Sequence, residues 1–113
     1  MKTSSAKAKG RRAVAELREK ILTKYPDLDP QDIWVVPSGV NGPDLGLSAA
    51  ALKKLPFMFE VKNVERLNLN KALAQCEAHA EGTALTPLLV FRRNREKLRV
   101  VLSLDDFLEL LTA

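Results

Sequence analysis

A strongly apolar stretch at residues 57–62, interrupted by two opposite charges, constrains the fold more than any other feature of the sequence. Its aromatic and β-branched residues favour a β-strand, in which alternate side chains point to opposite faces. Glu60 and Lys62 then share one face, and the apolar residues Phe57, Phe59 and Val61 share the other. A charged pair on so apolar a strand is costly unless its face is solvated or the charges have a use. The stretch therefore predicts a sheet strand that carries a candidate functional pair.

The rest of the sequence predicts one domain that contains both helices and strands. The 113 residues suffice for a single domain with its own core. Hydrophobic spacing predicts helices at residues 10–24, 69–81 and 104–111, and strands at residues 33–36, 57–62, 87–92 and 97–102. Residues 48–54 are ambiguous between a helical turn and a loop, and Ser103 is the expected N-cap of the last helix. We therefore expect an α/β domain in which helices flank a central mixed β-sheet.

Positive charge is concentrated at the N-terminal end. The formal net charge is +4, but residues 1–24 contain eight basic and two acidic residues, which gives this segment a net charge of +6. Such asymmetry indicates either a polyanionic partner or a solubilising tail. We expect residues 1–9 to form a flexible basic arm and residues 10–113 to form the folded domain.

Composition excludes several classes of protein. The single cysteine, Cys76, and the single histidine, His79, exclude a disulfide framework and multi-cysteine zinc modules. No apolar run approaches the roughly 18 residues of a membrane helix, so we expect no membrane partner and a cytoplasmic location. Cys76 and Trp34 are expected in the core, and His79 on the surface of a helix and not as a general base.

Asp44 is the third component of the candidate site, because it follows a turn-rich loop at residues 38–43. If its strand neighbours that of Glu60, two carboxylates converge beside Lys62, and such hard oxygen ligands suit Mg²⁺. A metal held there can activate water and polarise a phosphate, while the lysine positions the water or steadies negative charge. The pattern predicts metal-assisted hydrolysis of a phosphodiester. The alternative is an exposed strand face with an incidental Glu–Lys pair.

Together, Pro43-Asp44 and Glu60-Val61-Lys62 resemble the signature of the PD-(D/E)xK nuclease superfamily. More narrowly, the chain resembles small archaeal-type and phage-type Holliday junction resolvases and related phage endonucleases. The resemblance covers most of the chain, from Lys9-Gly10-Arg11-Arg12 to Leu104-Asp105-Asp106-Phe107. It implies a restriction-endonuclease-like fold for residues 10–113.

The resemblance also implies a role for each candidate residue. Asp44 and Glu60 would be the main metal ligands, together with the carbonyl group of Val61. Lys62 would be the catalytic lysine, and Gln75 would orient the site or contact the scissile strand. The implied cofactor is Mg²⁺, for which Mn²⁺ could substitute, and no nucleotide cofactor is expected.

Glu16 would complete the metal sphere by the same resemblance. An equally good explanation is that Glu16 forms i,i+4 ion pairs with Arg12 and Lys20 on the first helix. Both interpretations remain open at the level of sequence.

Several polar residues are candidates for contact with DNA phosphates: Lys9, Arg11, Arg12, Ser38, Asn41 and Lys71. Turn chemistry also explains Ser38 and Asn41, and a lone helical lysine such as Lys71 is often only solvated. A second basic cluster, formed by Arg92, Arg93 and Arg95, either contacts DNA or protects a sheet edge by charge.

The sequence thus predicts a Mg²⁺-dependent DNA endonuclease that selects branched or structured DNA, like a Holliday junction resolvase. The resemblance also implies a homodimer, because junction resolvases cut two strands symmetrically and a two-fold dimer fits such a substrate. Two alternatives remain: a related phage nuclease that acts on linear duplex or single strands, and a non-catalytic DNA-binding protein on the same scaffold.

Overall fold

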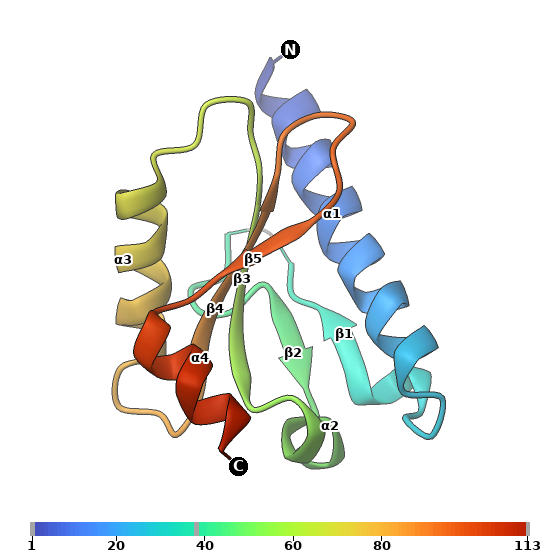
Figure 1. The fold of residues 1–113 in the computed structure, drawn as a ribbon. Coiled ribbons are helices and arrows are strands. Elements are labelled where there is room, and N and C mark those ends of the chain that lie inside the picture. The colour runs from blue at the N-terminus through green and yellow to red at the C-terminus, as the bar shows by residue number, and fades with distance from the viewer. Residues whose placement is uncertain (1, 38, 113) are drawn as a thin grey trace.

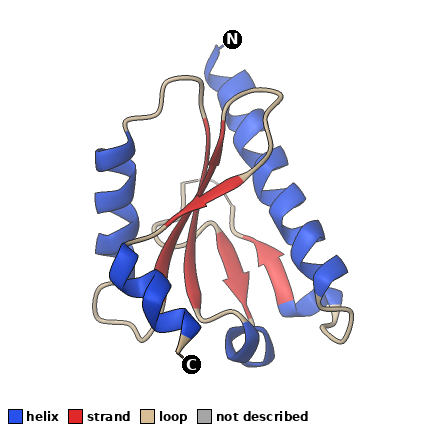
Figure 2. Cartoon of the chain, in the orientation of Figure 1, coloured by secondary structure: helices blue, strands red, loops and turns tan. Residues whose placement is uncertain are grey.

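The computed structural model describes residues 2–37 and 39–112, with side chains from residue 5 onward. Figures 1 and 2 show a sheet region between two longer helices. In chain order the elements are α1 (Lys2–Lys24), the short 3₁₀ helix η1 (Pro30–Asp32), β1 (Ile33–Val35), β2 (Leu45–Leu47), α2 (Ala49–Lys54), β3 (Phe57–Asn63), α3 (Leu69–Ala80), β4 (Thr86–Arg92), β5 (Arg99–Val101) and α4 (Leu104–Leu111). This order confirms the predicted α/β class.

The strands form two small sheets. β3 pairs in parallel with β4, and β4 pairs in antiparallel with β5, which gives the mixed sheet that the sequence predicts. β1 and β2 form a separate antiparallel pair. The backbone N–H of Asp44, just before β2, donates a hydrogen bond to the carbonyl of Phe59 on β3 (3.0 Å), so the two sheets meet beside the charged strand.

The core lies between α1 and one face of the strands. Four small and branched residues of α1 pack against this face: Ala13, Val14, Leu17 and Ile21. Their partners include Phe59 and Val61 on β3 and Val90 on β4. α3 covers the opposite face of β3 and β4, as Figure 1 shows. The two faces of β3 are therefore in different surroundings, and Glu60 lies on the α3 side.

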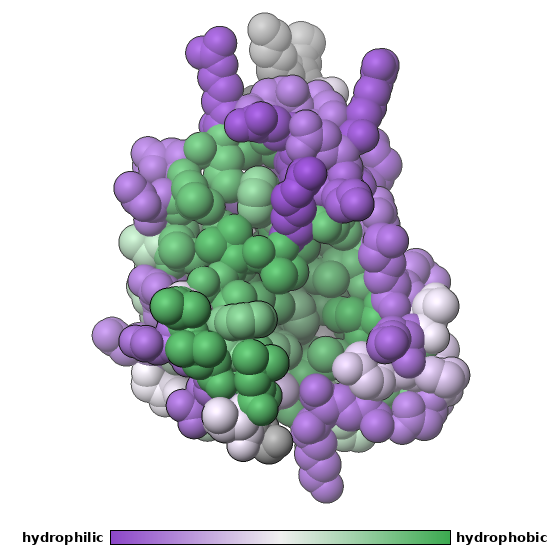
Figure 3. Space-filling view, viewed as in Figure 1, coloured by the Kyte–Doolittle hydropathy of each residue, from purple (hydrophilic) through white to green (hydrophobic). Residues whose placement is uncertain are grey.

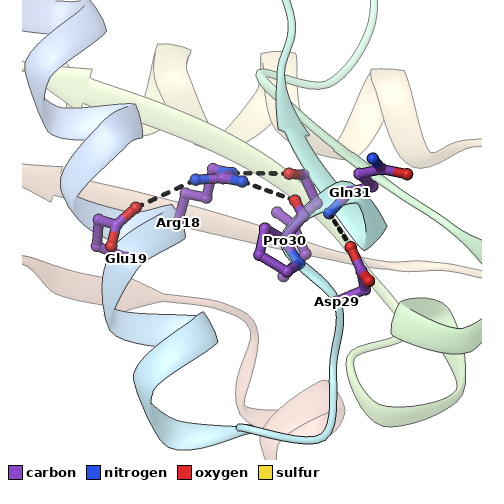
Figure 4. A network of polar contacts seen from close by, with 6 residues as sticks. Arg18, Glu19, Asp29, Pro30 and Gln31 are labelled. Atoms are coloured by element: carbon purple, nitrogen blue, oxygen red, sulfur yellow. Dashed lines mark hydrogen bonds and ion pairs between the residues drawn. The ribbon is translucent and has the colours of Figure 1, made fainter.

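A polar network fixes the start of β1 to the middle of α1. The Arg18 guanidinium group donates to the carbonyls of Ile33 (2.7 Å) and Pro30 (2.6 Å) and contacts Glu19 (Figure 4). Beside it, the carboxylate of Asp29 accepts a hydrogen bond from the backbone N–H of Gln31 and caps η1. These bonds hold β1, and with it the paired strand β2, in a defined position relative to the core.

Two parts of the structure differ in detail from what the sequence suggests. Residues 2–9 form the first turns of α1, because their alanines and lysines are good helix formers and no proline interrupts them, while the basic arm at residues 1–9 stays a prediction. Trp34 is not a core residue, since 48% of its surface is exposed. It alternates with Ile33, which takes the inward position on this short strand.

The C-terminal elements follow the prediction more closely. α4 has the predicted bounds, and the Ser103 side chain accepts a hydrogen bond from the backbone N–H of Asp106 as its N-cap. The strand predicted at residues 97–102 is shorter, because only Arg99–Val101 pairs with β4. Within the described residues, no helix is long and apolar enough to cross a membrane.

Candidate functional site

Asp44 is held rigidly at the junction of the two sheets. Its backbone N–H donates to Phe59, and its carbonyl accepts from the backbone N–H of Val36 (3.1 Å). Its carboxylate oxygen Oδ2 accepts a hydrogen bond from the backbone N–H of Val61 (2.7 Å). The side chain thus satisfies a backbone donor on the edge of β3 and lies against the charged strand.

Glu60 is the most deeply placed charged side chain of the site, with only 5% of its surface exposed. Its oxygen Oε2 lies 3.8 Å from Nζ of Lys62, and Oε1 lies 3.1 Å from Nδ1 of His79. Burial raises the pKa of Glu60, and the negative charge of Asp44 raises it further, while His79 and Lys62 act in the opposite direction. The structure therefore brings Asp44, Glu60 and Lys62 together, as the sequence predicts.

Sequence reasoning missed the contact of His79 with Glu60. The prediction of a surface histidine is wrong: the side chain is half-buried and contacts Glu60. Helical spacing could have indicated this contact, because His79 lies three residues after Cys76 and seven after Ala72, and both of these residues are buried on α3. The inward face of α3 therefore ends at the site.

The candidate residues on α3 lie on the side of Lys62. Gln75 and Lys71 line a hollow together with Lys62, Arg66 and Asn68. Asn68 caps α3 by accepting a hydrogen bond from the backbone N–H of Lys71 (3.1 Å), which fixes the start of this helix. Gln75 and Lys71 are exposed, so both side chains are available to a ligand in this hollow.

A second hollow leads to Asp44 from α1. Lys7 and Arg11 line it together with Val35, Asp44 and Val61. Arg11 is thus near the site, as predicted, and Lys7 joins it because residues 2–9 are helical. The lining of this hollow combines one half-buried carboxylate with two exposed cationic side chains.

The other predicted DNA contacts are more dispersed. Nζ of Lys9 donates a hydrogen bond to Oδ1 of Asn94 in the β4–β5 connection (3.1 Å), and Arg12 is exposed on α1. Asn41 is exposed in the loop before Asp44, and Ser38 lies outside the described residues.

Glu16 does not form the ion pairs with Arg12 and Lys20 that were considered from the sequence. Its Oε1 lies 2.5 Å from Nη1 of Arg92, so its partner is at the end of β4 and not on α1. Arg92, considered above as a DNA contact, is engaged in this pair. The role of Glu16 as a metal ligand stays a prediction.

The residues at the centre of the site fit a hard divalent cation. Among the described residues, no group of three or more His, Cys, Asp or Glu side chains could hold a metal ion. A site of two carboxylates and a backbone carbonyl does not need such a group. Burial and the charge of Asp44 raise the pKa of Glu60 despite His79 and Lys62, and a cation between the carboxylates would act in the opposite direction.

No protein-family model, curated protein or solved structure matched the chain.

Proposed function

We propose that this protein is a Mg²⁺-dependent DNA endonuclease with a restriction-endonuclease-like fold. The observation that carries the proposal is the convergence of Asp44 and buried Glu60 beside Lys62 at the junction of the two sheets. A purely structural Glu–Lys pair would not need a second carboxylate fixed at the same strand. An accumulation of negative charge in a partly buried position is typical of functional sites.

Asp44 and Glu60, with the carbonyl of Val61, would hold the cation. Bound there, Mg²⁺ would polarise a phosphate group and lower the pKa of a bound water. Lys62 remains about one-third exposed, so its ammonium group can reach the attacking water or the developing negative charge while Glu60 limits its motion. His79 orients Glu60 by holding Oε1, which directs the other oxygen toward Lys62.

DNA would approach through the cationic rims of the two hollows. Lys7 and Arg11 border Asp44, whereas Lys71 and Arg66 border Lys62. Contacts of this kind neutralise phosphates without reading sequence, and they make affinity fall steeply with salt. This distribution supports recognition of a branched or structured DNA backbone.

The exposed face of α4 supports the homodimer. Leu104, Phe107, Leu108 and Leu111 form one stripe at helical spacing, and each is 47–69% exposed. None of the eight residues of α4 is buried, and so short a helix is not stable alone in water. Figure 3 shows the apolar surface that extends over α4 and the neighbouring strand region. A second copy related by two-fold symmetry would cover this stripe and present two sites to one substrate.

A cleavage panel tests the proposal. Four-way junction, linear duplex and single-stranded DNA are incubated with the protein in Mg²⁺, Mn²⁺ or EDTA. We expect metal-dependent cutting with preference for the junction, and loss of cutting in Asp44→Asn and Lys62→Ala. The matched controls, Glu77→Gln and Lys53→Ala, change the same charges at exposed positions outside the site and should cut normally.

Each contrary result has a distinct meaning. Binding without cutting under every metal condition would favour the non-catalytic DNA-binding protein and reject the endonuclease. Preference for linear duplex or single strands would retain the nuclease and reject the resolvase-like selectivity.

A further inference from the structure

Trp34 is a large apolar side chain in an unusual position. It lies on β1 directly opposite Gly46 of β2, and its indole ring occupies the space above this glycine. A Cβ atom at position 46 would lie 2.1 Å from Cε2 of Trp34, so only glycine permits this placement. The ring is thus seated on the sheet, yet 48% of the residue remains exposed.

The same sheet face leads from Trp34 to Asp44. The ladder that pairs Trp34 with Gly46 continues to Val36 and Asp44, because the Val36 N–H donates to the Asp44 carbonyl (3.1 Å). Residues two apart on a strand share a face, so Trp34 and Gly46 are neighbours of the Val36–Asp44 pair. An exposed indole therefore lies two residue pairs along the ladder from the pair that contains a proposed metal ligand.

We propose that Trp34 is a stacking platform for an unpaired nucleobase of the DNA strand that enters the site. This inference rests on the proposed function. An aromatic ring next to phosphate-binding cations accepts any base through its π-face, and it can do so only where the base is free of the duplex stack. Lys7 and Arg11 border the hollow at Asp44, so a strand that enters the site would meet these cations at the end of the ladder that leads to Trp34. The substrate class is then DNA with unpaired bases at or beside the cut, and not continuous duplex.

The simplest competing explanation is that Trp34 only covers the backbone of Gly46. Both explanations place an aromatic ring on the sheet, but only stacking requires a base. The experiment must therefore compare ligands that have the same phosphates and differ in their bases.

Trp34 is the only tryptophan of the chain, so fluorescence excited at wavelengths that Tyr25 does not absorb reports on this ring alone. The full chain is titrated in EDTA, which prevents cutting, with a short oligothymidylate and with an abasic oligonucleotide of equal length. We expect quenching by the oligothymidylate and none by the abasic strand. Labelled-strand anisotropy should show that Trp34→Leu weakens oligothymidylate binding at least about fivefold, while Trp34→Tyr retains most of it. The control, Val100→Ala, truncates an exposed apolar side chain on β5 and should bind like the wild type.

Equal quenching by the two strands, absence of binding, or unchanged affinity in Trp34→Leu would overturn the inference. The circular dichroism spectrum and urea midpoint of Trp34→Leu establish that a loss of affinity does not come from unfolding. Because these titrations contain no metal, their outcome is independent of cleavage. Cutting without base-dependent quenching rejects the platform alone, whereas base-dependent quenching without cutting rejects the nuclease alone.

Discussion

Replacing Asp44 by alanine and by asparagine separates its structural role from its charge. Both variants remove the negative charge that contributes to the raised pKa of Glu60, so both gain the same electrostatic relief. Asparagine keeps a side-chain oxygen that can accept the hydrogen bond from the Val61 N–H, which alanine lacks. Val61 is buried, so in Asp44→Ala this donor has no partner. The difference in stability between the two variants therefore isolates one hydrogen bond.

A buried polar group left without a partner costs about 1–3 kcal/mol, so Asp44→Ala should be less stable than Asp44→Asn by this amount. For a domain of this size each kcal/mol corresponds to roughly 4–8 °C in Tm. Urea denaturation at neutral pH without divalent metal, followed by fluorescence of Trp34, gives the two free energies of unfolding. The pair Glu77→Ala and Glu77→Gln is the exposed control and should differ by less than about 0.5 kcal/mol. Equal stability of the two Asp44 variants would refute the account of how this side chain is anchored.

Three further predictions concern the charge, the orientation and the assembly of the site. Burial and the charge of Asp44 raise the pKa of Glu60 above its unfolded value, so ionised Glu60 destabilises the fold at neutral pH. Glu60→Gln should therefore raise the free energy of unfolding at neutral pH, and this gain should shrink on acidification. Urea titrations at several pH values measure the gain, and its absence would contradict the reasoning. His79→Ala should weaken Mn²⁺ binding about 10- to 100-fold in calorimetry while His79→Gln recovers part of it, and unchanged affinity in His79→Ala would exclude its orienting role. Phe107→Glu should convert the proposed dimer to a monomer in sedimentation equilibrium. The control is Val40→Glu, which changes an exposed apolar residue outside α4. A wild-type protein that is monomeric at every concentration would contradict the dimer.

The sequence predicted the elements whose cause is local. The 3–4 residue spacing of α1 and the alternation of β3 arise from which side chains are buried, and these patterns are visible in the chain itself. Ser103 likewise identifies the start of α4, because capping depends only on nearby backbone groups. The convergence of Asp44, Glu60 and Lys62 was also predictable, since Glu60 and Lys62 share one face of β3 and the segment just before β2 brings Asp44 beside that strand.

The features that the sequence did not predict depend on contacts between distant segments. The ring of Trp34 lies against the sheet because Gly46 on the partner strand leaves room for it, and strand register is not encoded in either segment alone. Glu16 pairs with Arg92, which is 76 residues away, so no helical spacing rule could identify its partner. His79 was accessible in principle, because its position on the buried face of α3 follows from periodicity, but a polar residue at the margin of that face is ambiguous.

If Asp44 and Glu60 jointly hold one divalent cation, Mn²⁺ titration of the full chain followed by calorimetry measures this directly. The expected result is one ion per chain, with affinity reduced at least tenfold in both Asp44→Asn and Glu60→Gln, and unchanged in Glu77→Gln. Equal Mn²⁺ affinity in the wild type and in the two site variants would show that these carboxylates are not the ligands, and would contradict the proposed metal-dependent chemistry at this site.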